Sequence, residues 1–375
     1  MTKDFVLVLD VGSSKLRLVN AGRGVNNTFI VTGSAETEYD GYYQGSFIHP
    51  ENIGKALQGL LNELDYEIGG KNRKIYIGVP AEFSSVVCTQ ATYNLGQRRK
   101  IKKSDLDSLF YTAGEKAKTE NVEVVSVSAM SYRLDEGRTS IYPIGEQAMN
   151  ITAELSIIYC VKEFIETFNS IVASLGFESV EYISEPLAEG LFVISKEGRE
   201  ELNMVINVGD LTSSVSFVKG EGLAKMLSFS IGGGHVTNDL SEAFELTLGE
   251  ADRLKRQIVL SLKGGNNDNY ELTTDQGKVI KIPMNVANEV VGARIEVIAG
   301  AIAQCVQMFS SSYISYLPVY LTGAGISQIK GGRDYLAKCL GRNISYGVPP
   351  LPGKDKPQLA SIYSLVAAAL GQNNE

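Results

Sequence analysis

The sequence predicts an α/β protein built from two similar halves that face each other across a cleft. Phe5 to Asp10 is a β-branched-rich strand, and a short turn joins it to an alternating strand at Lys15 to Val19. Met204 to Asn207 and Val215 to Val218 repeat this arrangement around a longer turn, about half the chain later. The length of 375 residues and the 44% hydrophobic composition suit a packed globular protein of two or more domains. Two unrelated hairpins in one α/β protein are the alternative.

Helices and strands alternate through the first half. Apolar residues at helical spacing predict a helix over Pro50 to Leu64, and Lys74 to Val79 reads as a buried strand. We expect Ser104 to cap a helix at Asp105 to Ala117. Residues 81 to 160 form a small α+β unit in this interpretation, with strands at Val122–Val127, Ser131–Leu134 and Ile151–Tyr159.

The remaining elements complete the first half and build the second. Helices at Lys162–Leu175 and Pro186–Glu197 flank a short strand at Val180–Ile183. The second half has a mostly helical stretch at Leu240–Ser261, a polar loop at Gly264–Gly277, a long helix at Val286–Phe309, a strand at Val319–Thr322 and a last helix at Leu359–Leu370. We therefore expect a first half made of residues 1–80 and 161–202, an inserted unit at 81–160, and a second half at 203–375 with 236–318 as its smaller subdomain.

Charge and cysteine content exclude several classes of protein. The formal net charge of −8 offers no basic field to attract nucleic acid, so we expect no nucleic-acid partner. The four cysteines form no CxxC pair and the two histidines lie near none of them, which argues against disulfides and zinc. The start lacks the pattern of a signal peptide, and no apolar run is long enough for a membrane span. These features predict a cytoplasmic protein.

Three glycine-containing turns could bind phosphate, because glycine lets backbone N–H groups approach an oxyanion closely. Each follows an apolar strand, which is where α/β sheets place their ligands. Each turn alone is equally consistent with ordinary structural punctuation. The turns are Gly12-Ser13-Ser14-Lys15, Gly209-Asp210-Leu211-Thr212 and Gly323-Ala324-Gly325.

Four further side chains are candidates for the chemistry of a nucleotide. Asp10 could hold Mg²⁺ through water, since magnesium keeps most of its waters and uses one or two carboxylates; a turn cap is the alternative. Glu185 could orient an attacking water, although an acid is also favoured at a helix N-terminus. Asp252 and Lys255, three residues apart on one helix face, could bind a ribose or simply form a surface ion pair.

In this order the segments resemble the actin-like ATPase superfamily, and more closely the FtsA family of bacterial cell-division proteins. Asp10 to Lys15 resembles the first phosphate loop, Glu185 to Ala188 the first connecting helix, Asn207 to Thr212 the second phosphate loop, and Leu321 to Gly325 the adenosine loop. Gly233 to Asp239 and Ala251 to Lys255 are similar to the family's GGxHVTxD and AExxK runs. Ile101 to Asp105, Tyr132 to Asp135 and Tyr142 to Gly145 resemble its relocated subdomain, called 1C.

The resemblance implies an actin-like fold of two ribonuclease H-like halves, with ATP and Mg²⁺ bound between them. It places Asp10, Gly12, Ser13, Ser14 and Lys15 at the nucleotide, together with Asn207, Gly209, Thr212, Asp252, Lys255, Gly323, Ala324 and Gly325. It also implies self-association through residues 81–160 and a role linking FtsZ-type filaments to membrane-associated partners at the division site.

The sequence departs from the family pattern at the second phosphate loop. Asn207 and Ser214 stand where the family carries Asp, and Asp210 and Leu211 stand near its glycines. Asn207 lacks the charge that favours Mg²⁺, and Asp210 adds a like charge near the γ-phosphate. We therefore expect ATP and Mg²⁺ to bind more weakly than is usual in the family, and hydrolysis to be slow or absent.

The end of the sequence shapes the expected membrane contact. Gln372 to Glu375 follow the last helix, and no basic amphipathic segment of the kind that binds membranes is present there. We expect contact with the membrane to be indirect, through partners.

Two other functions share this fold. One is a PilM-like adaptor for type IV pilus assembly, and the other is a sugar kinase or phosphatase. The run at His235 to Asp239 and the segment Tyr142 to Gly145 favour FtsA. The sequence thus predicts a nucleotide-binding scaffold with at most weak ATPase activity.

Overall fold

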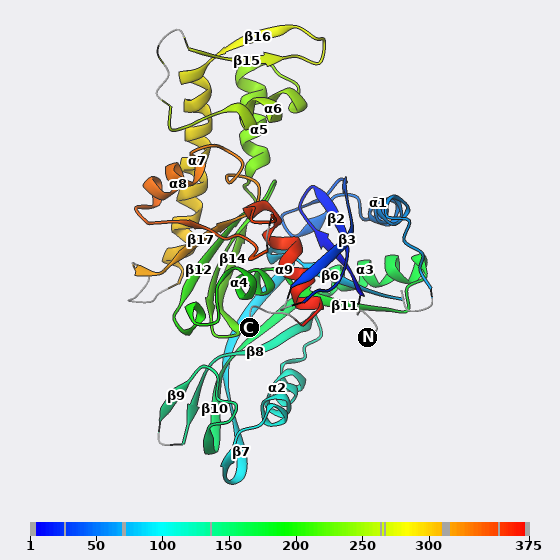
Figure 1. Ribbon diagram of the computed structural model, residues 1–375, viewed down its shortest axis with the longest axis vertical. Coiled ribbons are helices and arrows are strands. Elements are labelled where there is room, and N and C mark those ends of the chain that lie inside the picture. The colour runs from blue at the N-terminus through cyan, green and yellow to red at the C-terminus, as the bar shows by residue number, and fades with distance from the viewer. Residues whose placement is uncertain are drawn as a thin grey trace.

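In the computed structural model, two five-stranded mixed sheets form the centre of the molecule (Figure 1). The structure describes residues 5–25, 28–69, 73–135, 137–262, 265, 268–309, 316–351 and 353–371. The first sheet has the strand order β11-β6-β1-β2-β3. Its strands are β1 (Phe5–Val11), β2 (Lys15–Arg23), β3 (Phe29–Glu38), β6 (Lys74–Val79) and β11 (Ser179–Ser184).

The second sheet repeats the topology of the first. Its order is β14-β13-β12-β17-β18, an antiparallel meander extended by two parallel strands. The strands are β12 (Asn203–Val208), β13 (Ser213–Lys219), β14 (Gly222–Phe229), β17 (Val319–Thr322) and β18 (Ser345–Tyr346). The predicted pair of similar halves is confirmed. The structure adds a third strand, β3 or β14, to each predicted hairpin.

Alternation along β1 explains how the first sheet is covered on both faces. Leu7 and Leu9 face the buried residues of α1 (Pro50–Glu63) and α3 (Lys162–Leu175). Val6 and Val8 face the opposite way and pack against α4 (Glu185–Val193) and α9 (Ala360–Ala369). Because successive strand residues point to opposite faces, a continuously apolar strand such as this one is expected between two helical layers.

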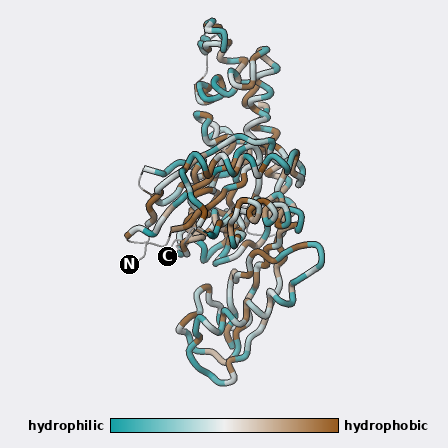
Figure 2. The backbone as a smooth tube through the Cα atoms, turned by 90° about the vertical axis from the view of Figure 1, so that its right-hand side faces the viewer, coloured by the Kyte–Doolittle hydropathy of each residue, from teal (hydrophilic) through white to brown (hydrophobic). Residues whose placement is uncertain are grey.

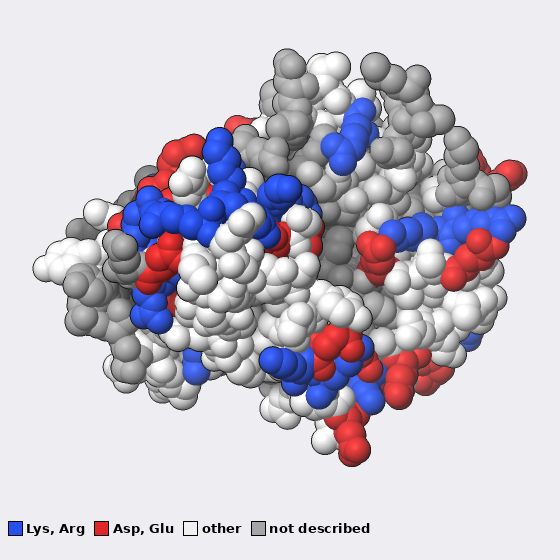
Figure 3. Space-filling model, turned by 90° about the horizontal axis from the view of Figure 1, so that it is seen from below, with Lys and Arg blue, Asp and Glu red and all other residues white. Residues whose placement is uncertain are grey.

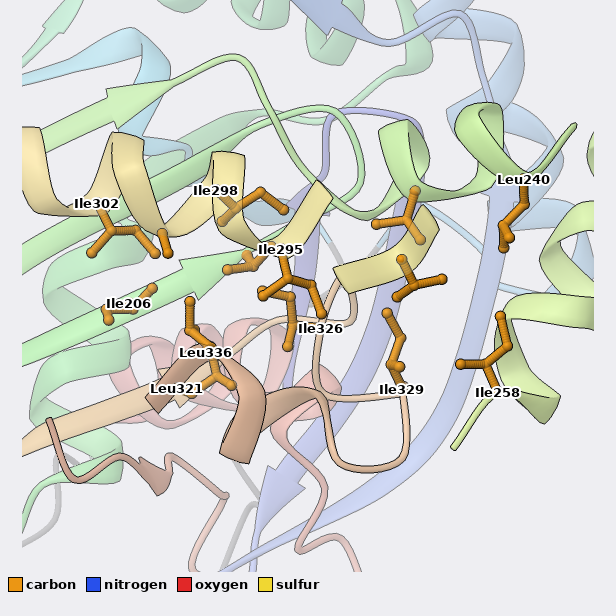
Figure 4. Packing of buried hydrophobic residues seen from close by; sticks show 14 of the residues in the cluster. Ile206, Leu240, Ile258, Ile295, Ile298, Ile302, Leu321, Ile326, Ile329 and Leu336 are labelled. Atoms are coloured by element: carbon orange, nitrogen blue, oxygen red, sulfur yellow. The ribbon is translucent and has the colours of Figure 1, made fainter. Parts of the chain in front are cut away.

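The main hydrophobic core of the second half lies on one face of the second sheet, beneath the helices that cover it. Helix α7 (Met284–Gln307) and α8 (Gly332–Leu340) place Ile295, Ile298, Ile302 and Leu336 against the strand residue Ile206 (Figure 4). Helices α5 (Gly233–Phe244) and α6 (Leu248–Gln257) close the same cluster through residues such as Leu240. The predicted single helical stretch at 240–261 is therefore two helices, and Glu245, with φ of 52°, ends the first of them.

A hairpin replaces part of the polar loop that we expected after these helices. Residues Asn269–Thr273 (β15) and Val279–Pro283 (β16) pair antiparallel, and Tyr270 and Leu272 point into the core. The alternation of polar and apolar side chains explains why a segment of polar composition forms strands. Gly264, where the predicted loop begins, lies outside the described residues.

The inserted unit is a four-stranded sheet covered by one helix, at the bottom of Figure 1. The order is β7-β10-β8-β9, with β7 (Ser84–Lys100), β8 (Val122–Leu134), β9 (Arg138–Ser140) and β10 (Gln147–Val161). Ile151–Tyr159 lies in a central strand, β10, so it presents no edge of this sheet. Helix α2 (Lys103–Ala117) starts before Ser104, and the Asp105 side chain caps it instead by accepting from the Lys102 amide at 2.8 Å.

The base of the inserted unit is joined to the second half of the molecule. The buried Ser156 hydroxyl donates to the Leu223 carbonyl oxygen at 2.9 Å and accepts from the Leu223 amide at 3.0 Å. The Glu221 amide donates to the Ala129 carbonyl at 3.0 Å. Small elements complete the chain, namely β4 (Tyr42–Tyr43), β5 (Ser46–Phe47), η1 (Ala81–Phe83), η2 (Gly198–Glu200) and η4 (Pro357–Leu359).

Hydrophobic segments gather mainly in the central body, between the inserted unit at one end of the molecule and the hairpin β15–β16 at the other (Figure 2). Basic and acidic side chains are interleaved on the face seen from below (Figure 3), which fits the modest net charge. Among the residues that the structure describes, no helix is both long and apolar enough to cross a membrane.

Candidate nucleotide cleft

A cleft of about 890 Å³ lies between the two halves and is lined by both. The turns after β1, β12 and β17 all open into it, so the structure brings the three glycine turns together. Parallel sheets place ligands outside the carboxyl ends of their strands, and these turns occupy that position in both sheets.

The two phosphate-type turns have the same backbone geometry. The Gly12 amide donates to the Lys15 carbonyl at 2.9 Å, and the Gly209 amide donates to the Thr212 carbonyl at 3.0 Å. A Cβ atom on either glycine would lie 2.8 Å from that carbonyl oxygen, so both positions require glycine. The turns are therefore equivalent structures in the two halves.

The third turn is also constrained to glycine. Gly323 has φ of 80°, and a Cβ atom there would lie 2.3 Å from the Val208 carbonyl oxygen. The Gly325 amide donates to the same Val208 oxygen at 2.8 Å. The adenosine-type turn and the second phosphate-type turn are thus packed backbone to backbone.

Helix α5 is attached to the second phosphate-type turn by its first amides. The Gly233 amide donates to the Gly209 carbonyl, and the Gly234 amide donates to the Asp210 carbonyl, each at 2.8 Å. His235 accepts from the Gly232 amide at 3.1 Å through Nδ1, which caps the helix. A structural role therefore accounts for His235.

Buried carboxylates form the floor of the cleft beneath these turns. Asp10, at the end of β1, is only 4% exposed; it accepts from the Ser361 hydroxyl at 3.0 Å and lies 3.7 Å from the Arg17 guanidinium. Glu185 and Glu189 lie one turn apart on α4. The Asn207 amide nitrogen is 3.4 Å from Glu185 Oε1 and 3.1 Å and 3.2 Å from the two oxygens of Glu189.

Burial raises the pKa of all three acids. Loss of water raises the pKa of Asp10, and the Arg17 charge partly opposes this. Burial and then the neighbouring Asp10 and Glu189 charges raise the pKa of Glu185 well above its usual range. Burial raises the pKa of Glu189 to about 7, while hydrogen bonds with Asn207 and Thr322 favour its ionised form. The floor therefore attracts cations or protons.

Glu189 is the site residue that sequence reasoning missed. It is 2% exposed and is the single charged residue in the run Leu187 to Val193, which forms most of α4. A charged residue inside an apolar helix is rarely buried without a partner, and that contrast was available in the sequence. Its partner Asn207 belongs to another element, which the sequence alone does not bring alongside.

The remaining predicted residues line the cleft, with their charges paired. Lys15 lies 3.6 Å from Glu36 and 3.5 Å from Glu38. Asp252 pairs with Lys255 at 3.3 Å and with Arg256 at 2.8 Å. Lys255 is buried and donates to the Gly233 carbonyl and the Thr237 hydroxyl, so it also fixes the start of α5.

The cleft fits a nucleotide better than a metal ion alone. Within the described part of the chain, no group of three or more His, Cys, Asp and Glu side chains could hold a metal ion. The turns offer the close backbone approach that phosphate groups need, and Asp10, Glu185 and Asn207 could contact the water shell of Mg²⁺.

Comparison with known proteins shows which members of this fold class the chain resembles. Residues 204–364 match the family model described as cell division protein FtsA. Curated proteins of that name match almost the whole chain: the one from Bacillus subtilis (strain 168) is 21% identical over 370 residues, covering 96% of this chain and 82% of the relative. The one from Rhizobium meliloti (strain 1021) is 23% identical over 364 residues, covering 92% and 81%. The chain is therefore similar to FtsA proteins over nearly its whole length.

Solved structures agree on the fold of this chain. A PilM-PilN type IV pilus biogenesis complex matches with a TM-score of 0.62 at 16% identity, covering 99% of this chain and 98% of that one. MreB 5 of Spiroplasma citri bound to AMPPNP matches with a TM-score of 0.59 at 11% identity, covering 100% and 98%. The predicted actin-like fold is confirmed.

Proposed function

We propose that this chain is an ATP-binding cytoskeletal scaffold of bacterial cell division that links FtsZ-type filaments to membrane-associated partners. The observation that carries the proposal is the convergence of both phosphate-type turns and the adenosine-type turn on one cleft in an FtsA-like chain. The AMPPNP and ADP bound in the MreB 5 structures support a nucleotide as the ligand.

In this proposal each part of the cleft has a distinct task. The turns Gly12–Lys15 and Gly209–Thr212 bind phosphates, Gly323–Gly325 and Asp252 bind the nucleoside, and Asp10 faces the Mg²⁺ water shell. Bound Mg²⁺ would neutralise phosphate charge. Glu185 is the residue that would orient water, and its burial together with the Asp210 charge leads us to propose hydrolysis that is slow or absent.

Self-association through residues 81–160 is the second part of the proposal. Strand β7 is the outer strand of its sheet, and exposed side chains along it include Thr89, Thr92 and Arg98. An unpaired strand edge can pair with another chain, and contacts that do not close produce filaments. We propose this edge as the contact between copies.

Two measurements test the scaffold function. Mass spectrometry of small molecules released from the purified protein should find adenine nucleotide. Co-sedimentation with FtsZ filaments should carry the chain into the pellet, and flotation with anionic liposomes should leave the isolated chain in solution unless a membrane partner is added. A chain that binds neither adenine nucleotide nor FtsZ would refute the proposal.

A PilM-like adaptor is the second candidate, and the PilM-PilN likeness over nearly the whole chain favours it as the runner-up. An adaptor of that kind should bind a pilus assembly peptide and ignore FtsZ, so the same co-sedimentation separates the two. A sugar kinase or phosphatase would instead transfer label from ATP to one member of a sugar panel, or release phosphate from a sugar phosphate.

A further inference from the structure

Asn207 and Glu189 form a buried pair at the floor of the cleft. Both Glu189 oxygens lie within 3.2 Å of the Asn207 amide nitrogen, and the same nitrogen reaches Glu185 at 3.4 Å. Asn207 lines the cleft, whereas the 2%-exposed Glu189 lies behind it on α4. Asn207 is therefore the member of the pair that could contact a ligand, and Glu189 supports Asn207 from behind.

The chemistry of this contact requires an amide at position 207. A carboxylate there would meet two other carboxylates without a donor between them, close to a third at Asp10. An amide of the same shape places its NH₂ group toward the acids and satisfies them. The surrounding carboxylates thus explain why this chain carries Asn where the FtsA resemblance leads us to expect Asp.

We propose that Asn207 and Glu189 are a matched pair in which Glu189, as a positioning residue, supplies the negative charge that Asn207 lacks. In this arrangement the charge that the family pattern places on β12 comes from α4, one layer behind the cleft wall. Glu189 orients the Asn207 amide and adds its field to that of Asp10, so that the water shell of a nucleotide-bound Mg²⁺ is still attracted. The inference rests on the proposed nucleotide function for its ligand, but the pairing itself does not.

A double-mutant cycle tests the pair in two independent ways. Calorimetry with ADP at pH 8, where Glu189 is ionised, compares the native chain, Glu189→Gln, Asn207→Asp and the double variant, once with Mg²⁺ and once with EDTA. Glu189→Gln should weaken ADP binding about tenfold with Mg²⁺ and much less with EDTA, because only the cation responds to the lost charge. Asn207→Asp should also weaken binding, and the double variant should recover most of the native affinity. Glu166→Gln, on the exposed side of α3, is the matched control and should bind as the native chain does.

Thermal unfolding without nucleotide tests the pairing even if the nucleotide proposal fails. Asn207→Asp should lower the unfolding temperature, and adding Glu189→Gln should recover much of it; poor folding of Asn207→Asp that the second change rescues has the same meaning. Additive effects, or Asn207→Asp alone binding Mg·ADP more tightly than the native chain, would overturn the matched pair. If Glu189→Gln lost the same ADP affinity with Mg²⁺ as with EDTA, the proposed effect of the Glu189 charge on the cation would be overturned. If no variant binds ADP, the proposed function fails and the unfolding cycle still decides the pair.

Discussion

The Ser13 hydroxyl oxygen accepts a hydrogen bond from the Leu211 amide at 3.0 Å, which joins the two phosphate-type turns directly across the cleft. These residues belong to different halves of the molecule. Under the proposed function, the Leu211 amide would be among the donors to a phosphate group in this turn. A phosphate group that accepted from the Leu211 amide would therefore compete with the bond that joins the two halves.

Replacing Ser13 by Ala should loosen this link. A neutral hydrogen bond of this kind contributes about 1 kcal/mol, so we expect a loss of that order in the free energy of unfolding. Hydrogen exchange at the Leu211 amide should accelerate in the nucleotide-free chain. Ser14→Ala, in the same turn, is the control; similar exchange in both variants would show that the Ser13 bond does not hold the halves together.

Gly41 supports the first phosphate-type turn from outside. It has φ of 75°, and a Cβ atom there would lie 2.0 Å from the Ser13 carbonyl oxygen. Gly41→Ala should cost about 2 kcal/mol or more in the free energy of unfolding, and should weaken nucleotide binding, because the turn must shift. Gly59→Ala on α1 meets no atom within 4 Å and should instead stabilise the fold by up to about 1 kcal/mol. Chemical denaturation of both variants measures this, and the same sign for both would contradict the account.

Arg199 holds the end of the helix that carries the two buried acids. It is 1% exposed and donates to the carbonyls of Leu191 at 2.8 Å, Ile194 at 2.6 Å and Gly220 at 3.0 Å. Arg199→Ala leaves these carbonyls without their donor, so we expect a loss of about 3 kcal/mol or more by denaturant unfolding. Arg98→Ala, an exposed position on β7, should change stability by less than about 0.5 kcal/mol. A comparable loss in both would show that Arg199 has no special role.

Local patterns predicted the elements that form the framework of the cleft. The predicted helix at Lys162–Leu175 and strand at Val319–Thr322 have the same bounds in the structure, because apolar spacing and terminal residues define both. Strand β7 was missed, since only Ala91, Tyr93 and Leu95 alternate as an apolar face within a mostly polar segment, and its pairing with β10 supplies much of its stability. Residue type alone indicated three turns suited to phosphate.

The floor of the cleft depends on contacts between distant segments, which composition and spacing do not encode. Arg199 stands in a polar sequence context that gives no hint of its burial, and the apolar context of Glu189 indicates a partner without identifying it. Asn207 was recognised as a departure from the family pattern, but its meaning changed once Glu189 lay beside it. Single positions were therefore predictable, whereas the charge balance of the site was not.

Stability should fall as the pH rises toward 8. The pKa of Glu189 is raised to about 7 from an ordinary value of 4.5, so the folded chain holds a proton that the unfolded chain has already released between these values. The contribution of Glu189 to the free energy of unfolding is therefore complete below about pH 4.5. It is lost as the pH rises through about 7, by roughly 3 kcal/mol. Burial raises the pKa of Asp10 and Glu185 in the same direction.

Unfolding temperatures at pH 5.5 and pH 8 measure this loss. Glu189→Gln should reduce the difference between the two pH values, because Gln carries no proton to release. A native chain that becomes more stable over this range, or a variant with the native slope, would contradict the assignment.

Asp210 should oppose the binding of a third phosphate group. Its side chain is exposed to the cleft, and a Cβ atom on Gly234 would lie 3.0 Å from Asp210 Oδ1, which places the carboxylate against the first turn of α5. The positive end of that helix would otherwise favour an anion. Two unit charges about 4 Å apart repel by roughly 4 kcal/mol at an effective dielectric near 20, and solvent in the open cleft reduces this to about 1 kcal/mol. Asp210→Gly should therefore tighten ATP about fivefold and ADP less, in calorimetry with Mg²⁺.

Asp210→Asn separates charge from shape, since it keeps the side chain and removes only the repulsion. Both variants should gain affinity for ATP if the charge is responsible, whereas a gain in Asp210→Gly alone would point to backbone freedom in the turn. Weaker ATP binding in both variants would make Asp210 a ligand of the nucleotide's Mg²⁺, and rapid hydrolysis by the native chain would equally defeat this account of the turn.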